Sequence, residues 1–225
     1  MNTIHHALEQ LRNSIQHTEQ HYQRKPNSVQ LLAVSKTKPA SMIATAYQAG
    51  QRHFGENYLQ EAMMKQQALG AFDITWHFIG PIQSNKTKAI ATHFSWVHSV
   101  DSLKTARRLS SQRPTQLPPL NICLQVNISE EQSKSGITLN ELPDLVNEVE
   151  QLPNLNLRGV MAIPAPCHEF TEQCKPYHAL YQAVQQLNRP TLDTFSFGMS
   201  DDLQAAIKEG ATMVRIGTAL FGARS

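Results

Sequence analysis

Residues 31–39 read Leu-Leu-Ala-Val-Ser-Lys-Thr-Lys-Pro, and this stretch decides how the rest of the chain is interpreted. The apolar run 29–34 is typical of a buried strand, because Val and Leu dominate it and no breaker interrupts it. Pro39 suits the first turn of a helix, where a missing N–H costs nothing. Lys36 therefore lies where a strand ends, the edge at which parallel α/β proteins carry out chemistry. Two interpretations stay open: a surface lysine, or a partly desolvated amine that attacks a carbonyl.

Strand-like and helix-like segments alternate along the rest of the chain. The strand-like segments are residues 29–34, 52–57, 74–80, 96–100, 121–127, 155–163, 194–198 and 212–216. Such alternation implies parallel pairing. Eight units in 225 residues imply an α/β fold, a single (β/α)8 TIM barrel, with an extra N-terminal helix at residues 3–22. An open doubly wound sheet is the alternative, but so short a chain favours closure.

Two of the expected helices begin with capping signals. Asp101 is predicted to cap the helix that carries Leu103. Thr138 and Glu141 are spaced as a capping box for the helix that follows residue 141.

Composition excludes several classes of protein. A net charge of only +2, without a block of Lys and Arg residues, argues against a protein that binds nucleic acid. Three cysteines without zinc-ligand spacing predict reduced thiols in a cytoplasmic protein and no metal site. The N-terminus lacks the apolar region of a signal peptide, and no apolar run approaches the ~18 residues of a membrane span. Because no linker composition interrupts the chain, we expect residues 1–225 to form one domain.

The exits of the seventh and eighth strands suggest an anion site. They carry Ser200, Gly217 and Thr218, and the loops at these two exits are the usual phosphate site of this barrel. Glycine lets backbone N–H groups approach an anion, and a helix N-terminus adds a favourable dipole. The alternative is that Ser200 merely caps a helix and Gly217 merely turns the chain. Asp201 and Asp202 would repel a phosphate, so they must point away from it.

Arg215 is the second chemical feature of this region. Residues two apart on a strand share a face, so Arg215 is expected to point into the barrel mouth beside Gly217. A buried arginine needs an acceptor. A salt bridge inside the barrel is one option, but the strands offer few acidic residues, which leaves a ligand. Pyridoxal 5′-phosphate suits this set: its aldehyde would form a Schiff base with Lys36, its phosphate would lie at Ser200, Gly217 and Thr218, and its pyridine nitrogen would accept from Arg215.

Seven motifs extend this hypothesis: VSKTKP, FGENY, WHFIGPIQSNK, VNISEEQSKSG, RGVMAIPAP, FGMSDD and MVRIGTALFGAR. Together they resemble the pyridoxal phosphate homeostasis protein family, whose members are single-domain relatives of the alanine racemase N-terminal barrel. The resemblance implies that Lys36 carries the cofactor and that the following residues surround it: Asn57, Met161, Ser200, Arg215, Gly217 and Thr218. It implies a cytoplasmic monomer that binds, buffers and delivers pyridoxal phosphate, with apo forms of pyridoxal phosphate enzymes as recipients. No firm catalytic reaction is attached to the family.

Two enzymatic alternatives remain. The first is a weak amino-acid racemase that uses Lys36 and either Tyr58 or His77 as bases. Racemisation needs a base on each face of the bound amino acid, and racemase relatives draw the second base from an extra β-domain for which we expect no room here. A permanently protonated arginine would also leave the pyridine nitrogen unprotonated and make it a poor electron sink. The second alternative is a Schiff-base aldolase acting on a phosphosugar.

Four side chains have a structural interpretation beside the functional one. His77 shares a face with Ile79, which favours a core histidine over a base. Met161 is either barrel packing or a soft contact to the cofactor ring. Lys134 is either solvated or a second, transient aldehyde-binding amine, and Lys38, expected on the same face as Lys36, could accept the cofactor during transfer.

Overall fold

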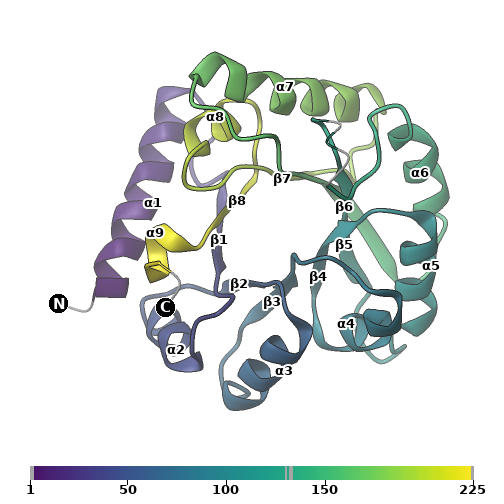
Figure 1. Ribbon diagram of the computed structural model, residues 1–225, viewed down its shortest axis with the longest axis horizontal. Helices are drawn as coiled ribbons and strands as arrows, with labels where there is room; N and C mark the ends of the chain where they lie inside the picture. Colours follow the sequence, from purple (N-terminus) through teal and green to yellow (C-terminus); the bar gives the residue numbers. More distant parts are fainter. Residues whose placement is uncertain (1–2, 130, 132–133, 224–225) are drawn as a thin grey trace.

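Eight parallel strands close into a barrel in chain order in the computed structural model, which describes residues 3–129, 131 and 134–223. Each strand pairs with the next, and β8 pairs with β1 through the partners Gln30 and Met213. Figure 1 shows the strands around the centre and the helices in an outer ring. The expected barrel is therefore confirmed, and pairing between the first and last strands excludes an open sheet.

The strands lie within about two residues of the segments expected from the apolar runs. They are β1 Gln30–Val34, β2 His53–Glu56, β3 Thr75–Phe78, β4 Trp96–Val100, β5 Leu120–Val126, β6 Leu155–Ala162, β7 Thr194–Ser196 and β8 Met213–Ile216.

The helices follow the strands, and the expected extra helix precedes them. They are α1 Thr3–His21, α2 Ala40–Gln48, α3 Leu59–Ala68, the 3-10 turn η1 Ser84–Lys86, α4 Thr87–His93, α5 Leu103–Gln112, α6 Leu142–Val149, α7 Phe170–Gln186, α8 Leu203–Lys208 and α9 Thr218–Phe221. Helix α1 contacts α2, α8 and α9, so it covers the seam where the first and last strands meet.

One of the two predicted caps is wrong. The N-cap of α5 is Ser102, whose hydroxyl accepts from the N–H of Thr105 at 3.3 Å. Asp101 lies one residue too early, and its carboxylate accepts from the hydroxyls of Ser102 and Thr105 instead. The reciprocal bonds of the expected capping box are present: the Thr138 N–H donates to Glu141 Oε2 at 2.8 Å, and the Glu141 N–H donates to Thr138 Oγ1 at 3.4 Å. They close the turn that leads into α6, whose own N-cap is Glu141.

Successive side chains of each strand point alternately outward and into the barrel, so the protein has one core beneath the helices and another in the lumen. Outward-facing side chains such as Phe54 and Phe78 are buried beneath the helices, and full burial of one such ring contributes about 2–3 kcal/mol. The lumen instead holds buried polar groups, among them His77, His98 and Arg215. Buried polar groups are costly unless they are hydrogen-bonded, so these three side chains depend on partners inside the barrel.

Three further findings concern the described residues. No described helix has both the length and the apolar character that crossing a membrane requires. Within residues 3–129, 131 and 134–223, no group of three or more His, Cys, Asp or Glu side chains could hold a metal ion. The three cysteines are free thiols.

Candidate functional site

The strand order brings most of the predicted site residues to one stretch of the barrel rim. Lys36 follows β1, Asn57 follows β2, Ser200 follows β7, and Gly217 with Thr218 follows β8. Strands β7, β8, β1 and β2 are consecutive neighbours in the closed barrel. Because parallel strands all end at the same rim, these exits lie side by side.

The loop that carries Lys36 is a tight turn. The Lys38 N–H donates to the Ser35 carbonyl at 3.1 Å, and Thr37 adopts a left-handed backbone with φ of 64°. Strand β1 ends at Val34, so the expectation that Lys36 and Lys38 share a strand face is wrong. The Lys38 ammonium instead donates to the Ala223 carbonyl at 2.5 Å and ties this turn to the chain that follows β8.

A buried charge cluster holds the residues on both sides of Lys36. Glu56 Oε1 accepts from the Ser35 hydroxyl at 2.6 Å and from the Lys65 ammonium at 2.7 Å. Lys65 also donates to the Ser35 carbonyl at 2.7 Å and to Glu61 Oε1 at 2.5 Å. Glu61 Oε1 in turn accepts from the Thr37 N–H at 2.6 Å. Side chains from β2 and α3 therefore hold the turn of Lys36 as a clamp, through Ser35 on one side and Thr37 on the other.

The charged groups of this clamp are buried, so the clamp is stable only while Glu56 and Lys65 stay paired. The Glu56 side chain is fully buried and that of Lys65 is 6% exposed. Burial raises the pKa of Glu56, although Lys65 and the Ser35 hydroxyl act in the opposite direction. Glu56 Oε2 is buried and has no hydrogen-bond partner among the described residues. This cluster was not predicted from the sequence; the available signal was the i, i+4 spacing of Glu61 and Lys65 on one helix.

A cavity of about 210 Å³ opens at the exits of β2, β3, β5 and β6. It is lined by Asn57, Ile79, Pro81, Gln125, Val126, Asn127, Lys134, Ser135, Met161 and Ile163. Two of the seven predicted cofactor residues, Asn57 and Met161, are therefore in its wall. Gly80 permits the close packing here, because a Cβ at that position would lie 2.1 Å from the Asn57 carbonyl oxygen.

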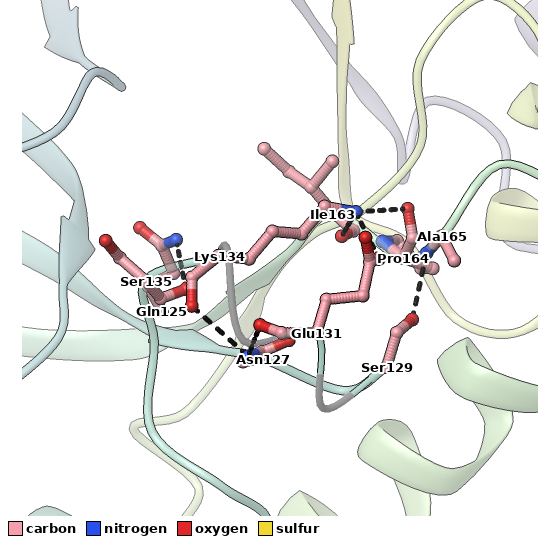
Figure 2. Close-up of polar contacts among 9 residues, drawn as sticks. All are labelled: Gln125, Asn127, Ser129, Glu131, Lys134, Ser135, Ile163, Pro164 and Ala165. Atoms are coloured by element: carbon pink, nitrogen blue, oxygen red, sulfur yellow. Dashed lines mark hydrogen bonds and ion pairs between the residues drawn. The ribbon is translucent and has the colours of Figure 1, made fainter.

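Two buried amide oxygens beside this cavity lack partners. Within the described part of the chain, neither Asn57 Oδ1 nor Asn127 Oδ1 has a hydrogen-bond partner. The orientation of Asn127 is fixed, because its Nδ2 donates to the carbonyls of Glu131 at 2.8 Å and Lys134 at 3.2 Å (Figure 2). A buried acceptor without a donor is costly, so a ligand that carries a donor group would be favoured at this edge.

Lys134 is held in place rather than freely solvated. Figure 2 shows its side chain reaching to the exit of β6, where the ammonium donates to the carbonyls of Ile163 at 3.3 Å and Pro164 at 3.2 Å. The ammonium also pairs with Glu131 at 2.6 Å. The Lys134 side chain is 29% exposed, so it is partly solvated as well as hydrogen-bonded, and it lines the cavity.

The expected phosphate region lies where β8 ends and the short helix α9 begins. Gly217 lies against β1, since a Cβ there would come within 3.2 Å of the Val34 carbonyl oxygen, and α9 begins at the next residue. Ser200 and Thr218 are exposed. The carboxylate of Asp202 accepts from the Met199 N–H at 2.6 Å and from the Tyr177 hydroxyl at 2.6 Å. These bonds engage Asp202 within the protein, while Asp201 is exposed.

Arg215 has hydrogen-bond acceptors within the protein, and they are neither the interior carboxylate nor the ligand that the sequence suggested. Its Nη1 donates to the carbonyl and hydroxyl oxygens of Ser196, and its Nη2 donates to the Ala162 carbonyl at 2.9 Å. Burial is the main influence on the pKa of Arg215 and lowers it. Because Ala162 and Ser196 end their strands, the guanidinium lies at the level of the β6 and β7 exits.

The two candidate bases differ in position. His77 is fully buried, and both of its ring nitrogens are hydrogen-bonded to other histidines. The interpretation of His77 as a core histidine is therefore confirmed. Tyr58 is 53% exposed at the start of α3.

Comparison with known proteins identifies the family of this barrel. The family model described as alanine racemase, N-terminal domain, matches residues 7–225. The pyridoxal phosphate homeostasis protein of Pseudomonas aeruginosa is 58% identical over 224 residues, which cover 100% of this chain and 97% of that protein. The protein of the same name from Escherichia coli is 54% identical over 229 residues, which cover 100% of this chain and 98% of that protein.

A solved structure extends the comparison to three dimensions. PipY of Synechococcus elongatus, solved with pyridoxal phosphate bound, is 38% identical and matches with a TM-score of 0.84, covering 97% of this chain and 100% of PipY. The match therefore spans the whole barrel. By family model, by full-length identity and by fold, the chain belongs to the pyridoxal phosphate homeostasis protein family, whose barrel is that of the alanine racemase N-terminal domain.

Proposed function

We propose that this protein binds pyridoxal 5′-phosphate through Lys36 and holds it for release, as a homeostasis protein rather than an enzyme. The observation that carries the proposal is the clamped turn of Lys36, which adjoins the Gly217 exit on the neighbouring strand. A primary amine and a helix start at Gly217, on adjacent exits, suit the aldehyde and the phosphate of this cofactor, which are carried by neighbouring ring carbons. Residues 1–225 would act as one binding domain.

The donor set at the rim fits the groups of the cofactor. Ser200, Gly217 and Thr218 would hold the phosphate, since the first N–H groups of a helix have no partner inside that helix. Arg215 would face the pyridine nitrogen: a guanidinium has five N–H donors, and its three hydrogen bonds to described residues leave donors for a ligand. Asn57 would accept from a donor group on the cofactor.

When bound, pyridoxal phosphate supplies an aldehyde that condenses reversibly with a primary amine. The chain's own contribution would be to hold that amine in place. The clamp of Glu56, Glu61 and Lys65 fixes the backbone before and after Lys36, so little backbone entropy is lost when the side chain engages a ligand. Met161, buried in the cavity wall, would supply an apolar surface for the ring.

A carrier role is better supported than racemisation. Of the two bases considered, His77 has both ring nitrogens engaged deep in the lumen. A protonated Arg215 at the pyridine nitrogen would also leave that nitrogen without its own proton. The wider role that we propose is that of a cytoplasmic monomer that delivers the cofactor to apo forms of pyridoxal phosphate enzymes, with Lys38 or Lys134 as secondary contacts during transfer.

Titration of the protein with pyridoxal phosphate tests the proposal, with the visible absorbance of the Schiff base as the signal. Lys36→Ala should abolish this band. Lys38→Ala is the matched control, since its lysine lies in the same turn but donates to the Ala223 carbonyl, and it should retain the band. An equal band in Lys36→Ala and in the wild type would refute the assignment.

A further inference from the structure

A continuous chain of hydrogen bonds runs through the barrel lumen and ends at Arg215. His53 Nδ1 lies 3.0 Å from His77 Nε2, and His77 Nδ1 lies 2.9 Å from His98 Nε2. His98 Nδ1 then lies 2.9 Å from Ser196 Oγ, which accepts from Arg215 Nη1 at 2.9 Å. Strands β4 and β7 are not neighbours in the barrel. The bond between His98 and Ser196 therefore spans the lumen and joins two strands that do not pair with each other.

The central residues of this hydrogen-bond chain are buried, and burial favours the neutral form of its histidines. His77, His98 and Ser196 are fully buried, and the His77 ring stacks on Trp96 at a centroid distance of 5.5 Å. Burial lowers the pKa of His98 to about 3, and the Arg215 charge acts in the same direction. Burial, with His98 and His53 nearby, also lowers the pKa of His77 well below its ordinary value.

The direction of every hydrogen bond in the chain follows from Arg215. A neutral histidine has one donor and one acceptor nitrogen, and a guanidinium can only donate. If Ser196 Oγ accepts from Arg215, its own hydrogen is satisfied by donating to His98 Nδ1. His98 must then carry its hydrogen on Nε2 and donate to His77, which must do the same toward His53. In the reverse order, the Ser196 hydroxyl hydrogen would have no acceptor among the described residues.

The two ends of this hydrogen-bond chain, His53 and Arg215, lie at opposite ends of the barrel. His53 is the first residue of β2 and lines a cavity of about 360 Å³ under α1, whose charged walls are Arg12, Glu19 and Arg52. Arg215 lies at the other end, at the level of the strand exits. The histidines therefore support the guanidinium from the side away from the rim.

We propose that His98, with His77 and His53 behind it, is a positioning residue for Arg215: its unprotonated Nδ1 accepts the Ser196 hydroxyl and so presents the Ser196 oxygen to the guanidinium. An added proton on His77 would set its Nδ1–H against the Nε2–H of His98, and an added proton on His98 would leave the Ser196 hydroxyl hydrogen without an acceptor among the described residues. The hydrogen-bond chain in this direction therefore requires both rings to be neutral. The consequence for ligand binding, a guanidinium held toward the ring nitrogen, rests on the proposed function.

The first test needs no ligand. Nitrogen-15 spectra of histidine-labelled protein at neutral pH should show His77 and His98 as neutral rings with the hydrogen on Nε2. Ser196→Ala should replace this single form by a mixture, which a purely space-filling role of Ser196 would not cause. A hydrogen on Nδ1 of either ring in the wild type, or unchanged spectra in Ser196→Ala, would overturn the proposal.

The second test measures affinity for pyridoxal phosphate and for its analogue with carbon in place of the ring nitrogen. His98→Leu, which has no acceptor, should weaken binding of pyridoxal phosphate about tenfold, or about 1.4 kcal/mol, and leave the analogue nearly unaffected. His98→Gln, which retains an acceptor, should recover most of the loss. Met213→Leu is the control, because it changes a buried side chain of β8 to one of similar volume. It should bind both ligands as the wild type does.

Equal weakening for both ligands would mean general loosening of the barrel and would overturn the positioning role, as would unchanged affinity in His98→Leu. Should His98→Leu fail to fold, Ser196→Ala supports the same comparison. If the wild type binds neither ligand, the proposed function fails. The histidine spectra still decide whether the hydrogen bonds of His77 and His98 have the proposed direction.

Discussion

Acidification should destabilise this fold through its buried histidines, and His98 allows the size of the effect to be worked out. The folded pKa of His98 is about 3, against an ordinary value of 6.5. The folded state therefore binds fewer protons than the unfolded state between these values, so stability rises with pH in this window. The contribution is complete above about pH 6.5 and is lost progressively as the pH falls toward about 3. Between pH 7 and pH 5 the loss is about 2 kcal/mol for this residue.

The assay is urea unfolding at both pH values, for the wild type and for His98→Gln. The variant should be less stable at pH 7, since a buried hydrogen bond is perturbed, but it should lose about 2 kcal/mol less than the wild type on acidification. Carboxylates common to both proteins cancel in this difference. His93→Gln is the control, because His93 is exposed at the end of α4, and it should lose as much as the wild type. Equal losses in the wild type and His98→Gln would refute this explanation.

Three further predictions concern the rim. Lys65→Met should cost about 3–5 kcal/mol in urea unfolding because it leaves the fully buried Glu56 carboxylate without its cation, and adding Glu56→Gln should recover part of the loss; a single variant as stable as the wild type would contradict the clamp. Gly80→Ala should destabilise strongly, since its Cβ would lie 2.1 Å from a backbone oxygen, whereas Gly70→Ala, whose Cβ would come no closer than 3.7 Å to its nearest atoms, should be tolerated; similar melting temperatures would contradict this. Gly217→Leu should weaken binding of pyridoxal phosphate far more than binding of unphosphorylated pyridoxal, and equal losses would count against a phosphate role.

The barrel was predictable because its signals are local. Each strand is a short apolar run bounded by turn residues, and eight such runs in 225 residues leave little room for another architecture. The strand exits follow from the same runs, so the amino-acid sequence alone predicts that Lys36 and Gly217 lie on neighbouring exits. The capping box was predictable for the same reason, whereas the cap of α5 was misplaced by one residue because Asp101 and Ser102 are both good caps.

The supporting contacts were not predictable, because they depend on geometry across the barrel. Lys65 is an ordinary exposed lysine by residue type, and only the packing of α3 on β2 buries it beside Glu56. The partner of Arg215 was sought among carboxylates, but the acceptors are a hydroxyl and two carbonyls on β6 and β7. The bond between His98 and Ser196 joins residues 98 positions apart on strands that do not pair with each other, which no local pattern encodes.

Lys36 is, in our proposal, the amine that holds pyridoxal phosphate. The most direct measurement is to mix the protein with the cofactor, reduce with borohydride, digest and locate the pyridoxyl group by mass spectrometry. We expect the adduct on the peptide that contains Lys36, close to one per chain, with at most minor labelling of Lys38 and Lys134. Stoichiometric labelling of another lysine, with the Lys36 peptide unmodified, would contradict this assignment.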